Sequence, residues 1–150
     1  MANAIFGWVR LIVIICCSFL SIFVLGCAER ADTFGAEVLG YNHTDQFIAA
    51  FTINGAYMGR SPSHGQSEAI CCIKIPSKWN SKLEVEVSWT KDDRSNEFWK
   101  SKVIKIPYYA STGHLAVHFF PHEEVRVIVS EVYVGHERYP FPSPFLREDK

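Results

Sequence analysis

The sequence lacks two features that often reveal a molecular function: an excess of charge and a catalytic signature. Lysine and arginine number 15 against 16 aspartate and glutamate, a formal net charge of -1. Nucleic-acid binding rests on neutralising phosphates, so this balance argues against it. The chain contains no G-x-S-x-G, H-E-x-x-H, P-loop or G-x-G-x-x-G motif. We therefore expect no catalytic residues, no enzyme activity, no cofactor and no small-molecule substrate.

Cysteine is scarce after residue 27, where only Cys71 and Cys72 occur. No second cysteine pair could complete a zinc site with them, so we expect no metal. Neighbouring Cα atoms across a trans peptide lie about 3.8 Å apart, which is short for a disulfide. We therefore favour two small buried side chains on opposite faces of a strand. The alternative is a strained, redox-labile vicinal disulfide.

Charge is absent from residues 11–25, an apolar run that follows the single cation Arg10. Fifteen such residues are short for a membrane span, which needs about 20, but they suit a signal peptide. The run ends in Val24-Leu25-Gly26-Cys27, the pattern of a lipobox. We predict a signal peptide over 1–26 and a tether over 27–36 that begins at lipidated Cys27. The alternative is an anchor helix that contains a cysteine by chance.

Lipidation at Cys27 has consequences for location. Two acyl chains already anchor a protein stably to a bilayer. The residue after the cysteine is Ala28 rather than aspartate, which resembles the sorting signal of outer-membrane lipoproteins. We therefore expect a periplasm-facing protein held at a membrane, on the inner leaflet of the outer membrane.

The remainder of the chain is rich in apolar residues and short of helical periodicity. With 48% hydrophobic and 14% aromatic residues it can bury a core, and its length suits one domain. Leu83–Thr90 alternates apolar and polar residues, as a strand with one face in water does. Similar runs predict an all-β domain over 37–138, an antiparallel β-sandwich or partly open barrel of about seven strands. The predicted strands are Glu37–Asn42, Phe47–Asn54, Ala69–Ile75, Leu83–Thr90, Phe98–Ile106, His114–Phe120 and Val125–Val134.

Two segments are candidates for binding a protein partner. The Asn54–Gly65 break is the longest, and breaks of this length are often functional. The second segment is the tail, residues 139–150, whose prolines prevent strand pairing, so that it either covers a sheet edge or presents a polyproline surface. The alternative for the first segment is a solvated hairpin loop. The candidate contact residues are Tyr57, Met58, Arg60, His64, Tyr139 and Phe141.

Three histidines, His114, His118 and His122, follow each other at four-residue spacing. On a strand four residues span about 13 Å, which is too far for two of them to share one metal ion. The apolar neighbours indicate a strand. We therefore expect no shared metal site, and an outward or edge position for His118.

Several short motifs together resemble a family of small Gram-negative lipoproteins that is known as a domain of unknown function. They are Gly40–Asp45, Ile48–Gly55, Cys71-Cys72 with Ile75–Trp79, Val87–Trp89 and Val117–Phe119. The resemblance covers about residues 37 to 130. Some members resemble, or are encoded as, immunity partners of type VI secretion lipase effectors, the Tli type.

The resemblance implies an immunity protein that binds and inhibits a secreted phospholipase effector. Its partners would then be the effector and, through the lipid anchor, a membrane. The alternative is an envelope scaffold or assembly lipoprotein that binds another envelope protein and inhibits nothing.

Overall fold

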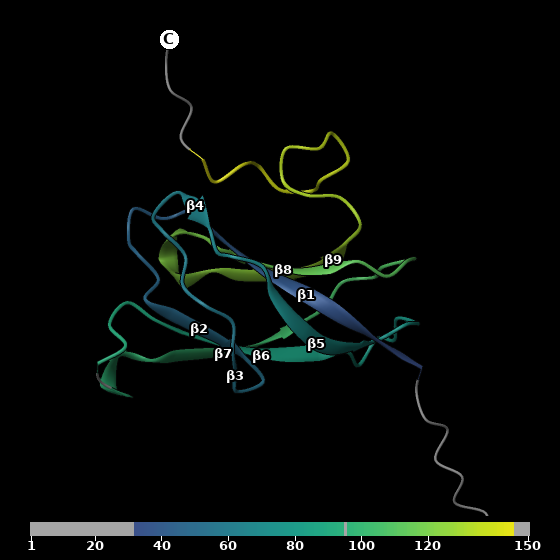
Figure 1. Ribbon diagram of the computed structural model, residues 1–150, viewed down its shortest axis with the longest axis horizontal. Helices are drawn as coiled ribbons and strands as arrows, with labels where there is room; N and C mark the ends of the chain where they lie inside the picture. Colours follow the sequence, from purple (N-terminus) through teal and green to yellow (C-terminus); the bar gives the residue numbers. More distant parts are fainter. Residues whose placement is uncertain (1–31, 95, 146–150) are drawn as a thin grey trace, which may run out of the picture. The chain divides into compact units, whose positions relative to one another are not determined.

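The computed structural model describes residues 32–94 and 96–145, and two β-sheets face each other there (Figure 1). The β-sandwich prediction is confirmed. The first sheet contains β1 (Thr33–Asn42), β4 (Gly65–Gln66), β5 (Ile70–Pro76), β8 (His114–Phe119) and β9 (Val125–Ser130). The second contains β2 (Ala50–Ile53), β3 (Ala56–Tyr57), β6 (Glu84–Thr90) and β7 (Lys100–Lys105). Two 3₁₀ turns, η1 (Asn96–Phe98) and η2 (Pro121–Glu123), each precede a strand.

The first sheet has the order β4-β1-β8-β9, and β5 pairs with the other half of the β1 edge that β4 occupies. The pairing of β1 with β8 is parallel, unlike the antiparallel pairing that we expected throughout. Parallel neighbours need a crossover connection. Here all four strands of the second sheet, together with β4 and β5, lie between β1 and β8 in the sequence and form this connection.

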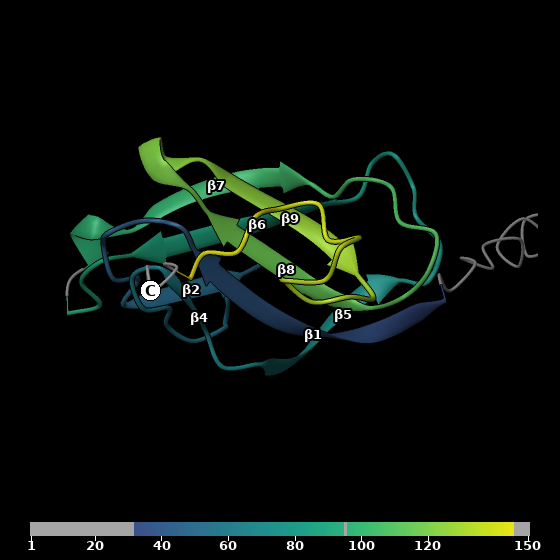
Figure 2. The ribbon, with the colours of Figure 1, turned by 90° about the horizontal axis from the view of Figure 1, so that it is seen from above.

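The second sheet is antiparallel, with the order β3-β2-β6-β7. The alternation over Leu83–Thr90 has the expected result: Val85, Val87 and Trp89 are buried, whereas Glu84 and Glu86 face water. Figure 2 shows β8 and β9 crossing over β6 and β7 at an angle, as the twist of packed sheets requires.

The main core lies between the sheets, where Phe51 meets Phe119 edge to face with ring centroids 5.5 Å apart. Gly40 lets β1 approach this core closely, since a Cβ at Gly40 would lie 2.8 Å from the Phe51 ring. The other buried apolar side chains include Val38, Ile53, Ile75, Val87, Trp89, Leu115, Val117 and Val127.

Several predicted boundaries differ from the structure: the strand predicted over Phe47–Asn54 is β2 (Ala50–Ile53), and the one predicted over Phe98–Ile106 is β7 (Lys100–Lys105). Residues 33–36, predicted as tether, belong to β1 and pair with β5. The last predicted strand ends at Ser130 rather than Val134. The Asn54–Gly65 segment is largely a hairpin return, because Asn54 and Gly55 both have positive φ, +50° and +80°. An Asn-Gly pair favours this tight two-residue turn.

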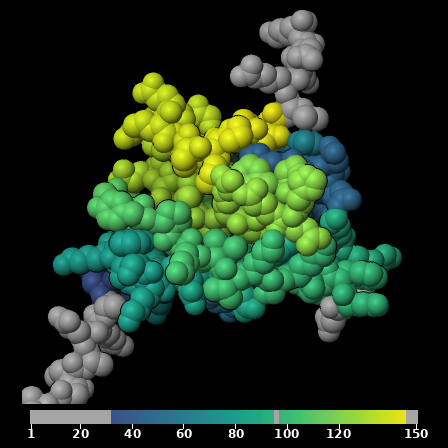
Figure 3. All heavy atoms as spheres, turned by 180° about the vertical axis from the view of Figure 1, so that it is seen from behind, coloured from purple at the N-terminus to yellow at the C-terminus, as the bar shows by residue number. Residues whose placement is uncertain are grey.

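The C-terminal strap, residues 131–145, crosses the outer face of the first sheet (Figures 1 and 3). We expected the tail to cover a sheet edge or to present a polyproline surface, but it covers the face of the sheet. A second apolar cluster forms beneath it from Leu39, Tyr41, Ala116, Ile128 and Tyr139, with Val132, Val134 and Phe141 packed against them.

The predicted signal peptide and Cys27 lie outside the described residues, as do residues 146–150. Within 32–94 and 96–145, no helix is long and apolar enough to cross a membrane.

Candidate functional site

The structure distributes the six predicted contact residues over four places. Tyr57 and Arg60 stay exposed and line a groove of about 560 Å³, which we call the edge groove. The groove lies beside the short strands β3 and β4, which are edge strands of the two sheets. Its lining residues are Tyr57, Gly59, Arg60, Pro62, Gln66, Glu68 and Ile70.

Met58 is not a contact residue, because it is 3% exposed and belongs to the main core. Its backbone N–H donates to the Phe51 carbonyl at 2.8 Å, which holds the return strand of the hairpin against β2. Side chains alternate along an extended chain, so Met58 points inward where Tyr57 points outward.

His64 lies apart from Tyr57 and Arg60, at one end of the sandwich. Its Nε2 contacts the Asp45 carboxylate at 2.7 Å. Both residues line a second hollow, described below.

Tyr139 and Phe141 belong to the C-terminal strap. Tyr139 is 8% exposed, and its hydroxyl makes a 2.8 Å hydrogen bond with His118 Nε2. Phe141 packs on His118 as well, with ring centroids 4.6 Å apart. Both side chains therefore fix the strap to the sheet, and Tyr139 is closed to a partner.

His118 is fully buried, which corrects the expectation of an outward or edge position. The His118 side chain lies on the outer face of β8, and the C-terminal strap covers that face. His118 Nδ1 lies 2.9 Å from His43 Nε2, so a chain of hydrogen bonds runs from His43 through His118 to Tyr139. Burial, followed by the neighbouring His43, lowers the pKa of His118 from 6.5 to about 3. The ring is therefore neutral at physiological pH.

Burial also moves the pKa values of the two neighbours of His118. It lowers the pKa of His43, aided by the charge of His64, and raises the pKa of the Tyr139 hydroxyl. A neutral imidazole has one N–H and one acceptor nitrogen. The three groups can thus satisfy one another without any net charge.

Cys71 and Cys72 lie side by side in β5 with their sulfur atoms paired as a disulfide. Both side chains are exposed, so the expectation of buried side chains on opposite faces is wrong. The strand continues through the pair, and Ile73 and Ile75 after it face the core.

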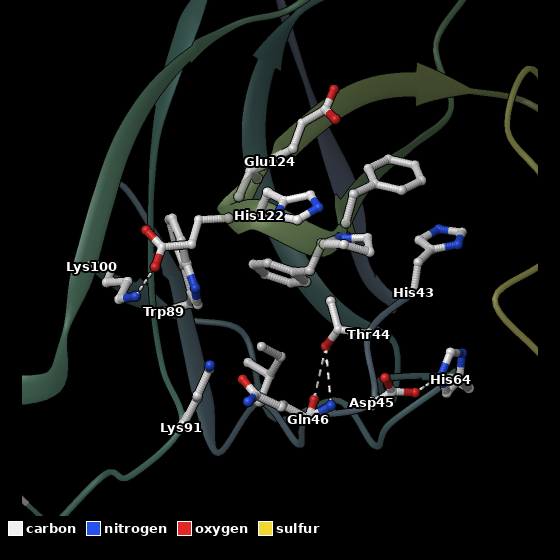
Figure 4. A pocket seen from close by; sticks show the side chains of 16 residues that line it. His43, Thr44, Asp45, Gln46, His64, Trp89, Lys91, Lys100, His122 and Glu124 are labelled. Carbon is white, nitrogen blue, oxygen red and sulfur yellow. Dashed lines mark hydrogen bonds and ion pairs between the residues drawn. The ribbon is translucent and has the colours of Figure 1, made fainter.

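The second hollow, which we call the loop-end cleft, measures about 510 Å³ and opens between the two sheets (Figure 4). Four connections contribute to it: 43–48 after β1, the one before β4 through His64, Lys91 after β6, and 120–124 between β8 and β9. Its floor is apolar and buried, with Ile48, Trp89, Phe119 and Val125. Its rim is polar, with Thr44, Asp45, Gln46, His64, Lys91, Lys100, His122, Glu123 and Glu124.

The loop-end cleft was not predicted from the sequence. The connections that form it are far apart in the chain, and the pairing of β1 with β4 and β8 and of β2 with β6 brings them together. Within the described part of the chain, no three His, Cys, Asp or Glu side chains are placed to hold a metal ion.

Comparisons with known proteins place the chain by family. No curated protein and no solved structure matches it. A family model described as "Protein of unknown function (DUF3304)" matches residues 41–127, from the end of β1 into β9. This match covers more than half of the 150 residues, so the chain belongs to the DUF3304 family.

Proposed function

We propose that this protein is a membrane-anchored immunity protein that binds and inhibits a phospholipase effector of a type VI secretion system. The observation that carries the proposal is the edge groove, where Tyr57 and Arg60 stand exposed beside two edge strands. Tyrosine and arginine are among the residue types that contribute most to protein–protein binding. Family resemblance supplies the kind of partner.

The surroundings of the groove suit a protein partner. Tyr57 is 55% exposed although it is large and apolar in its ring. It stands on β3, whose partner β2 is fixed in the core through Phe51 and Ile53. A rigid support lowers the entropy cost of ordering the contact residue on binding.

The position of the groove relative to the predicted anchor also suits this function. Asp32 follows Cys27 by about five residues, a reach of at most about 18 Å. The groove borders β4, which pairs with Tyr41 and Asn42 at the far end of β1 from Thr33. The ten residues of β1 place its two ends about 33 Å apart, so the groove lies far from the end of β1 that follows the tether. A tethered inhibitor of this kind is concentrated at the lipid surface that a phospholipase must approach.

We expect the double substitution Tyr57→Ala with Arg60→Ala to weaken effector binding at least 100-fold. Truncating a hot-spot residue typically costs about 2 kcal/mol or more, and each 1.4 kcal/mol is a factor of ten in Kd. The measurement is the Kd of the full-length protein, in detergent, for the purified phospholipase effector that the proposal requires.

The matched control is Lys78→Ala with Lys82→Ala, two exposed side chains in the connection between β5 and β6. This variant should bind as the unchanged protein does. Equal binding by both double variants would remove the edge groove from the interface. A stable complex that leaves lipid hydrolysis intact would instead support the scaffold alternative.

A further inference from the structure

In the loop-end cleft, the acidic side chains all have a partner of opposite charge or a hydrogen-bond partner, but one lysine has none among the described residues. Each of its three carboxylates has a partner: Asp45 contacts His64, Glu123 pairs with Lys100, and Glu124 accepts from Arg126 at 2.7 Å. Lys91 makes no hydrogen bond or ion pair within the described residues, although its charge acts on Glu123.

Two further polar side chains of the rim lack partners among the residues described. They are the amide of Gln46 and the imidazole of His122. Both can donate hydrogen bonds, as the Lys91 ammonium can. Lys91 therefore supplies an exposed positive charge without a partner in the described part of the chain, and the exposed Gln46 and His122 supply donors beside their acceptor atoms, a set that can bind an anion.

The floor of the cleft adds an apolar surface to this donor set. In Figure 4 the Lys91 side chain extends toward Trp89 and Lys100, and Lys100 pairs with Glu123. Trp89 and the nearby Phe119 belong to the main core, so the surface that they offer is fixed in place. Ligand sites commonly combine such an apolar lining with a few polar groups in a volume of this size.

The backbone of the rim is held in an uncommon conformation. His64, His122 and Glu123 all have left-handed φ values, +46°, +59° and +60°. Residues other than glycine rarely adopt this region, and they gather at binding sites when they do. The nearby Lys102 ammonium holds the turn in place by donating to the Glu123 carbonyl at 2.6 Å.

We propose that the loop-end cleft binds a small anionic amphiphile, with its carboxylate or phosphate at Lys91 and its apolar body against Trp89. Gln46 and His122 contribute further hydrogen-bond donors to the same anion. This site is separate from the edge groove, so the inference does not depend on the proposed immunity function.

The test uses the full-length protein in phosphatidylcholine nanodiscs, with the tryptophan side chains labelled with ¹⁵N. Octanoate and octyl phosphate serve as probes, below their micelle concentrations, and the shift of the Trp89 indole N–H is followed. Octyltrimethylammonium carries a similar apolar body with the opposite charge. Acetate and inorganic phosphate carry the anion without the apolar body.

We expect saturable shifts with an anionic amphiphile and none with the other three compounds. Lys91→Met should weaken binding about tenfold, whereas Lys78→Met, at an exposed position in the β5–β6 connection, should not change it. A larger response to one anionic probe distinguishes a carboxylate from a phosphate ligand. The absence of a saturable shift with both anionic probes, an equal response to the cation, or unchanged binding in Lys91→Met would overturn the proposal.

Discussion

Substituting Gly113 by alanine is expected to destabilise the fold by at least about 3 kcal/mol. A Cβ at this position would lie 2.2 Å from the Ser130 carbonyl oxygen and 2.5 Å from its carbon. These are backbone atoms at the start of the β8–β9 pairing, where His114 pairs with Ser130, so no side chain can rotate away. Losses of this size arise from a few mechanisms, and a clash that displaces a strand pair is one of them.

Urea unfolding of the full-length protein, followed by tryptophan fluorescence, measures this effect. The neighbouring Thr112→Ala is the control, because Thr112 is exposed and its change should stay within about 0.5 kcal/mol. If Gly113→Ala unfolded at the same urea concentration as Thr112→Ala, the close packing of β9 against the start of β8 would be wrong.

Lowering the pH from 7 to 5 is expected to reduce the free energy of unfolding by about 2 kcal/mol through His118 alone. The pKa of this histidine falls from 6.5 in the unfolded chain to about 3 in the folded protein. Between these values the unfolded chain binds a proton that the folded protein does not. Stability is therefore complete above pH 6.5 and decreases as the pH falls toward 3, by about 1.4 kcal/mol per unit.

Other groups face His118 and act in a consistent direction. The pKa values of His43 and His114 are also lowered by burial, so both histidines add to the loss at low pH. The positive charge of Arg126 further disfavours protonation of His118. Tyr41 stacks on the His118 ring from the same sheet, and Tyr139 contacts it from the strap.

The double variant His118→Phe with Tyr139→Phe separates this titration from the rest of the molecule. It keeps two aromatic rings in place and removes both partners of the buried hydrogen bond. Removing both partners avoids an unsatisfied hydroxyl at Tyr139, and the half-buried His43 is the one group that loses its hydrogen bond to His118. Urea unfolding at pH 7, 6 and 5 should show a shallower pH dependence in this variant. An unchanged slope would mean that His118 does not cause the loss.

The fold was largely predictable because alternation and turn residues are local signals. The strand predicted over Leu83–Thr90 is β6 (Glu84–Thr90), with the expected inner and outer faces. Met58 was misjudged, and the hairpin was only one of the two alternatives for the Asn54–Gly65 segment, although Asn54-Gly55 is a strong hairpin signal. Recognising that turn would have predicted a return strand and the inward position of Met58.

The environment of β8 could not be predicted from its own residues. His114, Ala116 and His118 alternate with apolar residues, which is typical of a strand with one face in water. All six residues of β8 are buried, because the strap covers the face that would otherwise be in water. The strap lies further along the chain, so the residues of β8 alone do not reveal it. The loop-end cleft was missed for the same reason, since its parts meet only through pairing between distant strands.

The measurement that tests the immunity proposal most directly is phospholipid hydrolysis by the phospholipase effector that the proposal requires. Increasing amounts of the full-length protein, reconstituted in vesicles, are added to a fixed amount of purified effector. We expect hydrolysis to fall in proportion and to stop near one inhibitor per effector. Tyr57→Ala with Arg60→Ala should restore hydrolysis at the same ratio. Undiminished hydrolysis in the presence of a stoichiometric excess of the unchanged protein would contradict the proposed function.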